Sequence, residues 1–289
     1  MNEEIQYSQY DRVVQLLDWN RFREAVKEAE NYIQMYPDDA DGYALLGRIY
    51  LAMDEYKKAL HWSEESLRRD PENPTGWEVR ALTLYTKQDW KATMHTIKEA
   101  LALFPENGVY YLLEGNIHNK NANPKKAKVS FEQALELEPY NAVYLAHYSY
   151  TLSMLREDEP STEAEVQALD LDPDNYLVFM YLGWAADQRG EHDKGLDYME
   201  NAVRLEPDNE QVRNEYVELL QKQYKLYRIL LYPTKVFRKM KPWIAVVTWI
   251  LVWIIFKPLV LVFIVLYVLS HWSTKLIVNK KIYGRLSGN

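Results

Sequence analysis

Cysteine is absent from this chain of 289 residues, which excludes disulfide bonds and zinc sites built on thiolates. Its absence is compatible with a reducing compartment. No basic stretch followed by an apolar run occurs between Met1 and Tyr10, so we expect no secretory signal there. The six histidines stand at spacings that build no pair of metal ligands, and we expect no bound metal ion.

Motifs of catalysis are missing as well. The segment from Gly42 to Ile49 approaches the spacing of a phosphate-binding loop, but it lacks the lysine that reaches phosphate and the hydroxyl residue that holds magnesium. It also lies in an expected helix, whose backbone N–H groups are already bonded. We therefore expect that the protein is not an enzyme and that it uses no cofactor.

Acidic residues are absent from the last part of the chain. Residues 229–289 carry nine lysines or arginines and no aspartate or glutamate. The rest of the chain holds the other 25 of 34 basic residues and all 42 acidic ones, a net charge of −17. Such asymmetry is typical of proteins that bind membranes or nucleic acid. The acidic main part lacks the electrostatic footprint of a nucleic-acid binder, so no nucleic-acid partner is expected.

Two uncharged apolar runs favour the membrane. They cover residues 243–256 and 259–272, and they are apolar all round, whereas a soluble helix shows a stripe. Their tryptophans are amphipathic rings of the kind favoured near lipid headgroups. We therefore predict that residues 233–289 form a membrane anchor that contacts lipid, with its main positions at Trp243, Trp249, Trp253, Lys257, Pro258 and Trp272.

The topology of this anchor has two solutions. A single kinked span crosses a hydrocarbon core of about 30 Å but places Lys257 near the centre, at roughly 2.5–3.5 kcal/mol. A hairpin that turns at Lys257 and Pro258 leaves both basic flanks on the cytoplasmic side. We favour the hairpin, and both topologies place the domain ahead of the anchor in the cytoplasm.

Proline recurs with a fixed period of 34 residues, at Pro37, Pro71, Pro105, Pro139, Pro173 and Pro207. Repeat units then begin at positions 6, 40, 74, 108, 142 and 176. The eighth and twentieth positions of a unit are mostly small, and the fourth is mostly large and aromatic. Small residues let two antiparallel helices approach, and large ones fill the gap to the next unit. The period therefore predicts stacked helix pairs, capped by a further helix over residues 210–232.

This pattern resembles the tetratricopeptide repeat (TPR) family across residues 6–209. The second unit carries the family's residues most fully, at Tyr43, Leu46, Gly47, Tyr50, Ala59 and Pro71. Units one and five depart most, because Val13 and Ser149 replace the glycine and Ser161 replaces the alanine. The resemblance implies an all-α, right-handed superhelical solenoid over residues 1–232, with six repeats and the capping helix, followed by hydrophobic membrane helices.

The resemblance also implies a concave groove, lined by the first helix of each unit, that binds a peptide or a partner helix. Its expected positions include residue types common at binding hot spots: Tyr10, Arg48, Glu78, Tyr85, Asn116, Asn119, Tyr150 and Trp184. Three other interpretations remain open. In the first, Asn116 and Asn119 are solvated helix residues, and the other two concern the remaining positions. Tyr150 and Trp184 pack across neighbouring helices, or Arg48 and Glu78 form a surface ion pair.

These patterns together predict a membrane-anchored adaptor or scaffold, which binds a protein or peptide ligand in its groove at the cytoplasmic face of a membrane. Two alternatives stay open. The first is a membrane-shaping protein that acts through the hairpin. The second is a regulatory subunit that contacts a membrane enzyme through the tail.

Overall fold

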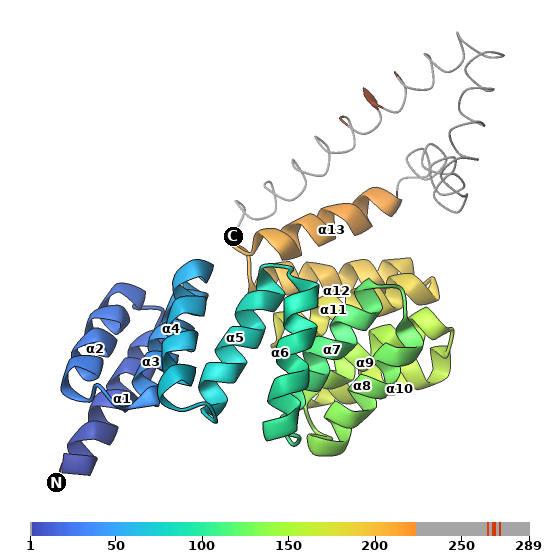
Figure 1. Ribbon diagram of the computed structural model, residues 1–289. Helices are drawn as coiled ribbons and strands as arrows, with labels where there is room; N and C mark the ends of the chain where they lie inside the picture. Colours follow the sequence, from blue (N-terminus) through green and yellow to red (C-terminus); the bar gives the residue numbers. More distant parts are fainter. Residues whose placement is uncertain (1, 224–264, 266–267, 270–271, 273–289) are drawn as a thin grey trace, which may run out of the picture. The chain divides into compact units, whose positions relative to one another are not determined.

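The computed structural model describes residues 2–223 together with residues 265, 268, 269 and 272, and these residues are helical apart from short connections (Figure 1). No strand occurs in this part of the chain, which confirms the all-α prediction. Its helices are α1 (Asn2–Asp18), α2 (Phe22–Met35), α3 (Ala40–Ala52), α4 (Tyr56–Arg69), α5 (Pro74–Thr86), α6 (Trp90–Leu103), α7 (Gly108–Lys120), α8 (Pro124–Leu137), α9 (Ala142–Leu155), α10 (Asp158–Leu171), α11 (Tyr176–Arg189), α12 (His192–Leu205) and α13 (Glu210–Gln223).

The odd-numbered helices are the first helices of the repeat units. The helices α3, α5, α7, α9 and α11 begin at the unit starts that the prolines indicate. The exception is α1, which begins at Asn2, ahead of the expected start at Gln6. Residues 2–5 contain neither proline nor glycine, so nothing in them prevents the helix from beginning ahead of Gln6. The expected continuation of the last helix to residue 232 lies outside the described residues.

Asparagine caps the first helices. Asn73, Asn107 and Asn175 are N-cap residues whose side-chain oxygens accept a backbone N–H from the first turn. The side chains of Asn141 and Asn209 accept equivalent bonds. A cap of this kind contributes about 1 kcal/mol. The asparagine two residues after each of the last five prolines therefore starts the next helix, and after Pro37 the same role falls to Asp39, whose side chain accepts from the N–H of Asp41 at 3.0 Å.

The turn inside each unit contains one residue in the left-handed backbone conformation. These residues also repeat every 34 positions, at Asn20, Asp54, Gln88, Ala122, Arg156 and Gly190, with φ between 54° and 94°. Only Gly190 lacks a Cβ. The left-handed conformation costs the other five residues roughly 1–2 kcal/mol each, which the packing of the two helices on either side of the turn must offset.

The paired helices approach most closely at the small positions of the repeat. A Cβ on Gly47 would lie 3.2 Å from the carbonyl oxygen of Ala59, so the glycine lets α4 approach α3. Unit five has serine at both positions. The hydroxyls of Ser149 and Ser161 each donate to the other residue's carbonyl, at 2.7 and 2.8 Å. Its departure from the family pattern is thus a reciprocal hydrogen bond between two buried serines.

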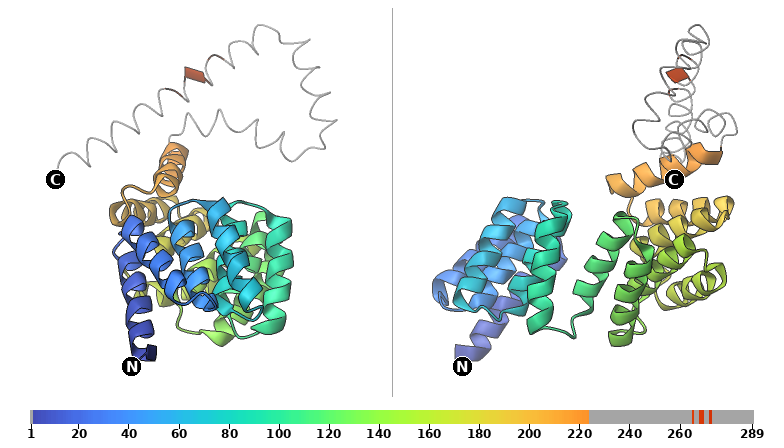
Figure 2. Two further views of the ribbon diagram at one scale, coloured as in Figure 1. Left: turned by 60° about the vertical axis from the view of Figure 1, so that its left-hand side comes forward. Right: turned by 45° about the vertical axis from the view of Figure 1, so that its right-hand side comes forward.

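The chain divides into two compact units, residues 1–144 and residues 145–289. In the first, each first helix contacts the next one, α1 with α3, α3 with α5 and α5 with α7, and the helix pairs follow one another in chain order (Figures 1 and 2). In the second, α13 buries its apolar stripe against α11 and α12. That stripe consists of the residues assigned to it from the sequence: Val212, Tyr216, Leu219 and Leu220.

Candidate partner-binding site

Two expected groove positions of the first compact unit, Tyr10 on α1 and Arg48 on α3, lie close together. Burial raises the pKa of Tyr10 and the carboxylate of Asp41 raises it further, while the Arg48 guanidinium lowers it. The ring of Tyr10 packs edge-on against buried Tyr32, with the ring centroids 5.9 Å apart. Arg48 itself is exposed. Tyr10 therefore has a packing role between α1 and α2, whereas Arg48 presents its charge to solvent.

The next expected groove residues lie on α5 and α7, and one side-chain contact connects the two helices. Burial raises the pKa of Tyr85, and a hydrogen bond between its side chain and Asn116 lowers it. Burial raises the pKa of Tyr110, and the charge of half-buried Glu78 raises it further. Asn119, also half-buried, follows Asn116 on α7. The sequence also left open a surface ion pair between Arg48 and Glu78. No such ion pair occurs among the described residues, so this interpretation is wrong.

The second compact unit brings Tyr150 and Trp184 together in a hollow of about 320 Å³. Tyr150 comes from α9 and Trp184 from α11, and their ring centroids lie 5.7 Å apart with the planes at 49°. The third helix that contributes is α13. The remaining lining residues are Asp187, Gln188, Glu215 and Glu218. The two aromatic residues therefore pack across neighbouring helices and also line a hollow.

The rim of this hollow is acidic. Three of its six lining residues are carboxylates, and none is lysine or arginine. The Trp184 Nε1 donates to Glu215 Oε2 at 2.9 Å, which fixes the orientation of the indole. Asp187 Oδ1 lies 2.7 Å from Nδ1 of exposed His192, and Glu218 is exposed. In the described part of the chain no group of three or more histidines and carboxylates is placed to hold a metal ion.

Two further aromatic residues, Tyr181 and His147, extend the cluster. The Tyr181 ring centroid lies 4.8 Å from that of Trp184 and 6.2 Å from that of Tyr150. His147 stacks on Tyr181 with the centroids 3.4 Å apart, and burial lowers the pKa of His147 to about 3. Neither residue stands at a repeat position expected to face the groove, so neither was predicted from the sequence. Their three-residue spacing from Tyr150 and Trp184 was the available signal.

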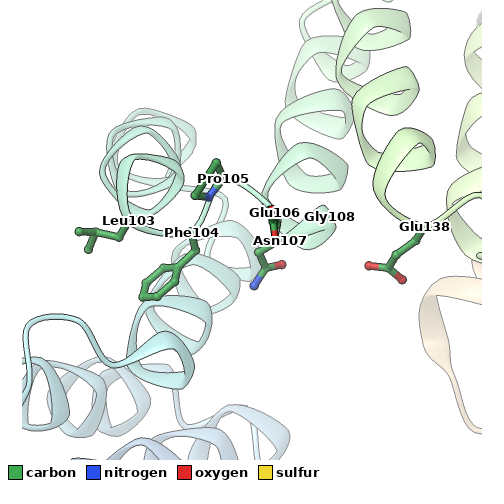
Figure 3. Close-up of a pocket in the computed structure, with 7 residues that line it drawn as sticks. All are labelled: Leu103, Phe104, Pro105, Glu106, Asn107, Gly108 and Glu138. Carbon is green, nitrogen blue, oxygen red and sulfur yellow. The ribbon is translucent and has the colours of Figure 1, made fainter.

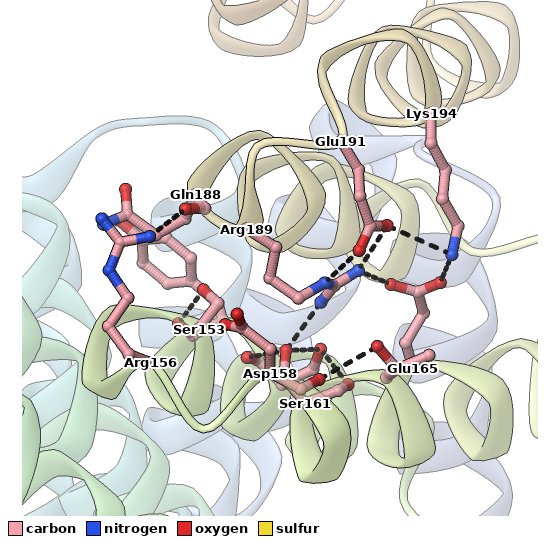
Figure 4. A network of polar contacts seen from close by, with 12 residues as sticks. Ser153, Arg156, Asp158, Ser161, Glu165, Gln188, Arg189, Glu191 and Lys194 are labelled. Carbon is pink, nitrogen blue, oxygen red and sulfur yellow. Dashed lines mark hydrogen bonds and ion pairs between the residues drawn. The ribbon is translucent and has the colours of Figure 1, made fainter.

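A buried ion-pair network connects α10, α11 and α12 (Figure 4). Arg189 pairs with Glu165, and both side chains are almost completely buried, at 2% and 1% exposed. The Arg189 Nε also lies 2.9 Å from Glu191 Oε1, and Lys194 forms a second ion pair with Glu165. Two cations thus face two carboxylates. The charged groups of the network pair with one another, so the network joins the last two repeats.

Another hollow, of about 480 Å³, lies in the first compact unit at the connection between α6 and α7 (Figure 3). Its lining residues are Leu103, Phe104, Pro105, Glu106, Asn107, Gly108 and Glu138. Two of its polar lining residues, Asn107 and Glu138, are bonded within the protein. Asn107 caps α7 through the N–H of Val109 at 3.0 Å, and Glu138 accepts a hydrogen bond from Asn141 at 2.9 Å. Capping accounts for this hollow without a ligand.

Five expected anchor positions lie outside the described residues: Trp243, Trp249, Trp253, Lys257 and Pro258. The sixth, Trp272, is helical and 68% exposed. Three other described residues of the tail are exposed as well: Val265, Val268 and Leu269. None of the described helices has the length and apolar character needed to cross a membrane.

Comparison with known sequences identifies the repeats. Three family profiles described as tetratricopeptide repeat match residues 16–82, 109–141 and 163–210. The matched segments cover most of the first unit, the second unit, the start of the third, the fourth unit, and the end of the fifth with the sixth. No curated protein matches the chain.

Solved structures share the fold at low identity. One is the crystal structure of the APC/C hetero-tetramer Cut9–Hcn1, at 16% identity and a TM-score of 0.63, covering 74% of this chain and 42% of that one. This chain thus spans less than half of that relative. Another is PilF of Pseudomonas aeruginosa, at 20% identity and a TM-score of 0.60, covering 77% of this chain and 99% of that one. The helix pairs, the 34-residue period and these matches agree: the chain is built from tetratricopeptide repeats.

Proposed function

We propose that this protein is an adaptor that binds a protein or peptide partner in the hollow at Tyr150 and Trp184. The observation that carries the proposal is the convergence of three successive first helices on one hollow of about 320 Å³. Two aromatic rings line it and an acidic rim surrounds it. Large aromatic side chains supply contact area at little conformational cost, and they are enriched at the residues that dominate binding energy.

The size of the hollow suits a side chain of a partner. At about 320 Å³ it lies at the lower limit of the volumes that enclose a small ligand, and its rim residues Gln188 and Glu218 are exposed. A peptide or a helix that lies across α9, α11 and α13 would insert one side chain into the hollow, beside the two rings. Neighbouring parts of the partner would meet the exposed faces of the same helices.

The tail supports a location at a membrane. Residues 243–256 and 259–272 are uncharged and apolar, basic residues flank them, and the described residues of the tail, including Trp272, are exposed. We propose that this segment anchors the repeats at the cytoplasmic face of a membrane. Confinement there raises the effective concentration of a membrane-bound partner, so a weak site can still be occupied.

Photocrosslinking in cells tests the adaptor proposal. A photoreactive amino acid replaces Tyr150 or Trp184 in the full chain, and the control carries it at Gln167, an exposed position on the second helix α10. We expect one discrete protein to be captured from positions 150 and 184 and not from 167. Capture of nothing, or the same capture from all three positions, would reject the adaptor.

Exchange of the tail tests the anchor. Residues 233–289 are replaced by an unrelated membrane span with the same orientation. We expect the crosslink from Trp184 to survive, since the span only confines the repeats. Loss of the crosslink would instead favour a subunit that contacts its enzyme through the tail. Recovery of the unmodified chain in the soluble fraction would contradict anchoring.

A further inference from the structure

The helices from α9 to α13, which carry the hollow, have a strongly one-sided charge. Residues 142–223 carry 18 aspartates or glutamates and 6 lysines or arginines. Two of those six cations, Arg189 and Lys194, are held by Glu165 and Glu191 in the buried network. The field over this part of the surface is therefore negative, and it attracts cations and repels acidic ligands.

The lining of the hollow provides the contacts that a cation prefers. The rings of Tyr150 and Trp184 present π-faces, and a guanidinium or ammonium group gains electrostatic energy over such a face. Glu215 holds the indole through its N–H, so the ring is oriented before a ligand arrives. The carboxylates of Asp187, Glu215 and Glu218 line the same hollow, so they lie around a charge that enters it beside the rings.

One cation of the chain already lies beside this rim. Arg156, on the connection after α9, donates from Nη1 to the carbonyl oxygen of Gln188 at 3.0 Å (Figure 4). Gln188 is one of the lining residues, whereas Arg156 is not. A guanidinium is thus accommodated next to the hollow while the hollow itself keeps its acidic lining.

We propose that the hollow at Tyr150 and Trp184 binds an arginine or lysine side chain from a basic segment of the partner. This inference rests on the proposed adaptor function and adds the chemical class of the ligand. The aromatic faces select a flat or compact cation, and the carboxylates reject an acidic side chain. The surrounding negative field draws in the flanking basic residues of the segment and accelerates association.

A series of peptides with matched length and different charge tests the inference. The purified full chain, in a neutral detergent at physiological salt, is titrated into three fluorescein-labelled peptides of equal length. They alternate glycine with arginine, with citrulline or with glutamate, and fluorescence anisotropy reports binding. Citrulline keeps the shape of arginine and removes its charge. We expect the arginine peptide to bind, the citrulline peptide to bind roughly tenfold more weakly, and the glutamate peptide not to bind.

Variants locate the binding. Glu215→Gln combined with Glu218→Gln keeps an acceptor for the Trp184 N–H and removes two charges, and we expect roughly tenfold weaker binding of the arginine peptide. The matched control, Glu163→Gln combined with Glu206→Gln, removes two exposed charges elsewhere and should leave the affinity within twofold. Tyr150→Leu should weaken binding, and Tyr150→Phe, which keeps the ring, should restore it.

Several results would overturn the inference. They are equal affinity for the arginine and citrulline peptides, equal losses in the hollow and control variants, and an unchanged affinity of Tyr150→Leu. The photocrosslinker at position 184 could capture a partner that binds the Glu215→Gln, Glu218→Gln variant as tightly as the unmodified protein. That result would support the adaptor function and reject the basic ligand. If no partner is captured, the adaptor proposal fails independently of the peptide result.

Discussion

Replacing Glu165 with glutamine removes the carboxylate at the centre of the buried network in the last two repeats. Three groups share this carboxylate: Arg189, Lys194 and the hydroxyl of Tyr198, which donates to Oε1 at 2.9 Å. Burial lowers the pKa of Arg189, but the hydrogen bonds to Glu191 and Glu165 raise it more. An arginine side chain does not lose its proton in proteins, so the guanidinium stays charged after the substitution, and it is almost completely buried.

The expected loss of stability depends on the partner that Arg189 retains. Removing one partner of a buried ion pair generally costs about 3–5 kcal/mol, because it leaves an uncompensated buried charge. Glu191 still accepts from the Arg189 Nε at 2.9 Å. We therefore expect about 3 kcal/mol, the lower end of that range. The loss should stay within α10, α11 and α12, because each repeat depends mainly on its neighbours.

Hydrogen exchange measured by mass spectrometry resolves this loss along the chain. Peptides from α10 to α12 of Glu165→Gln should exchange roughly a hundredfold faster than in the unmodified protein. Peptides from α2 to α4 should be unchanged. The control is Glu28→Gln, which breaks the pair between Arg12 Nη2 and Glu28 Oε1 at 3.5 Å. That pair is largely exposed, and its loss should cost less than about 1 kcal/mol.

The double variant Glu165→Leu with Arg189→Met separates charge from packing. It removes both members of the buried pair together, so it should be less destabilised than the sum of the two single variants. A cost of Glu165→Gln no larger than that of Glu28→Gln would refute the reasoning. So would faster exchange that is spread evenly over the whole chain.

Two further predictions concern a buried histidine and a left-handed turn. His147 has a folded-state pKa of about 3, below its unfolded value, so the unfolded state binds more protons as pH falls. Its contribution to stability should fall by about 2 kcal/mol between pH 8 and pH 5, and urea unfolding should show that His147→Phe lacks this part of the pH dependence. Ala122 has a φ of 54°, so Ala122→Gly should stabilise the protein by about 0.5 kcal/mol. Ala102→Gly, at an exposed helical position, should destabilise it by up to about 1 kcal/mol, and equal effects of the two glycines would contradict the argument.

Much of the local fold was predictable because the helix boundaries and the close contacts recur with the 34-residue period. The prolines indicated where five first helices begin, and the small positions indicated where paired helices approach. The left-handed residues obey the same period, but Gln88, Ala122 and Arg156 are residue types that do not signal such a turn. Their conformation is imposed by the packing of the helices on either side, so composition alone does not show it.

The candidate site was predictable in part. Tyr150 and Trp184 were assigned to the groove by their position in the repeat, and the structure brings their rings to 5.7 Å. The acidic rim was missed because Glu215 and Glu218 lie on α13, which the sequence presented only as a cap. The Arg189–Glu165 pair spans 24 positions and two helices, and no periodic pattern marks a contact of that kind. The binding role of Tyr10, Tyr85 and the other groove positions stays a prediction.

The central claim is that a partner binds in the hollow at Tyr150 and Trp184. Its most direct test is the affinity of the captured partner for a variant in which a larger side chain fills this hollow. Gln188→Trp places bulk in the hollow from an exposed position and removes no buried side chain. Gln167→Trp makes the same change on the outer helix α10. Calorimetry on the purified full chain should show at least about a hundredfold weaker binding for Gln188→Trp and an unchanged affinity for Gln167→Trp. Equal affinities in all three proteins would show that the partner does not bind at Tyr150 and Trp184.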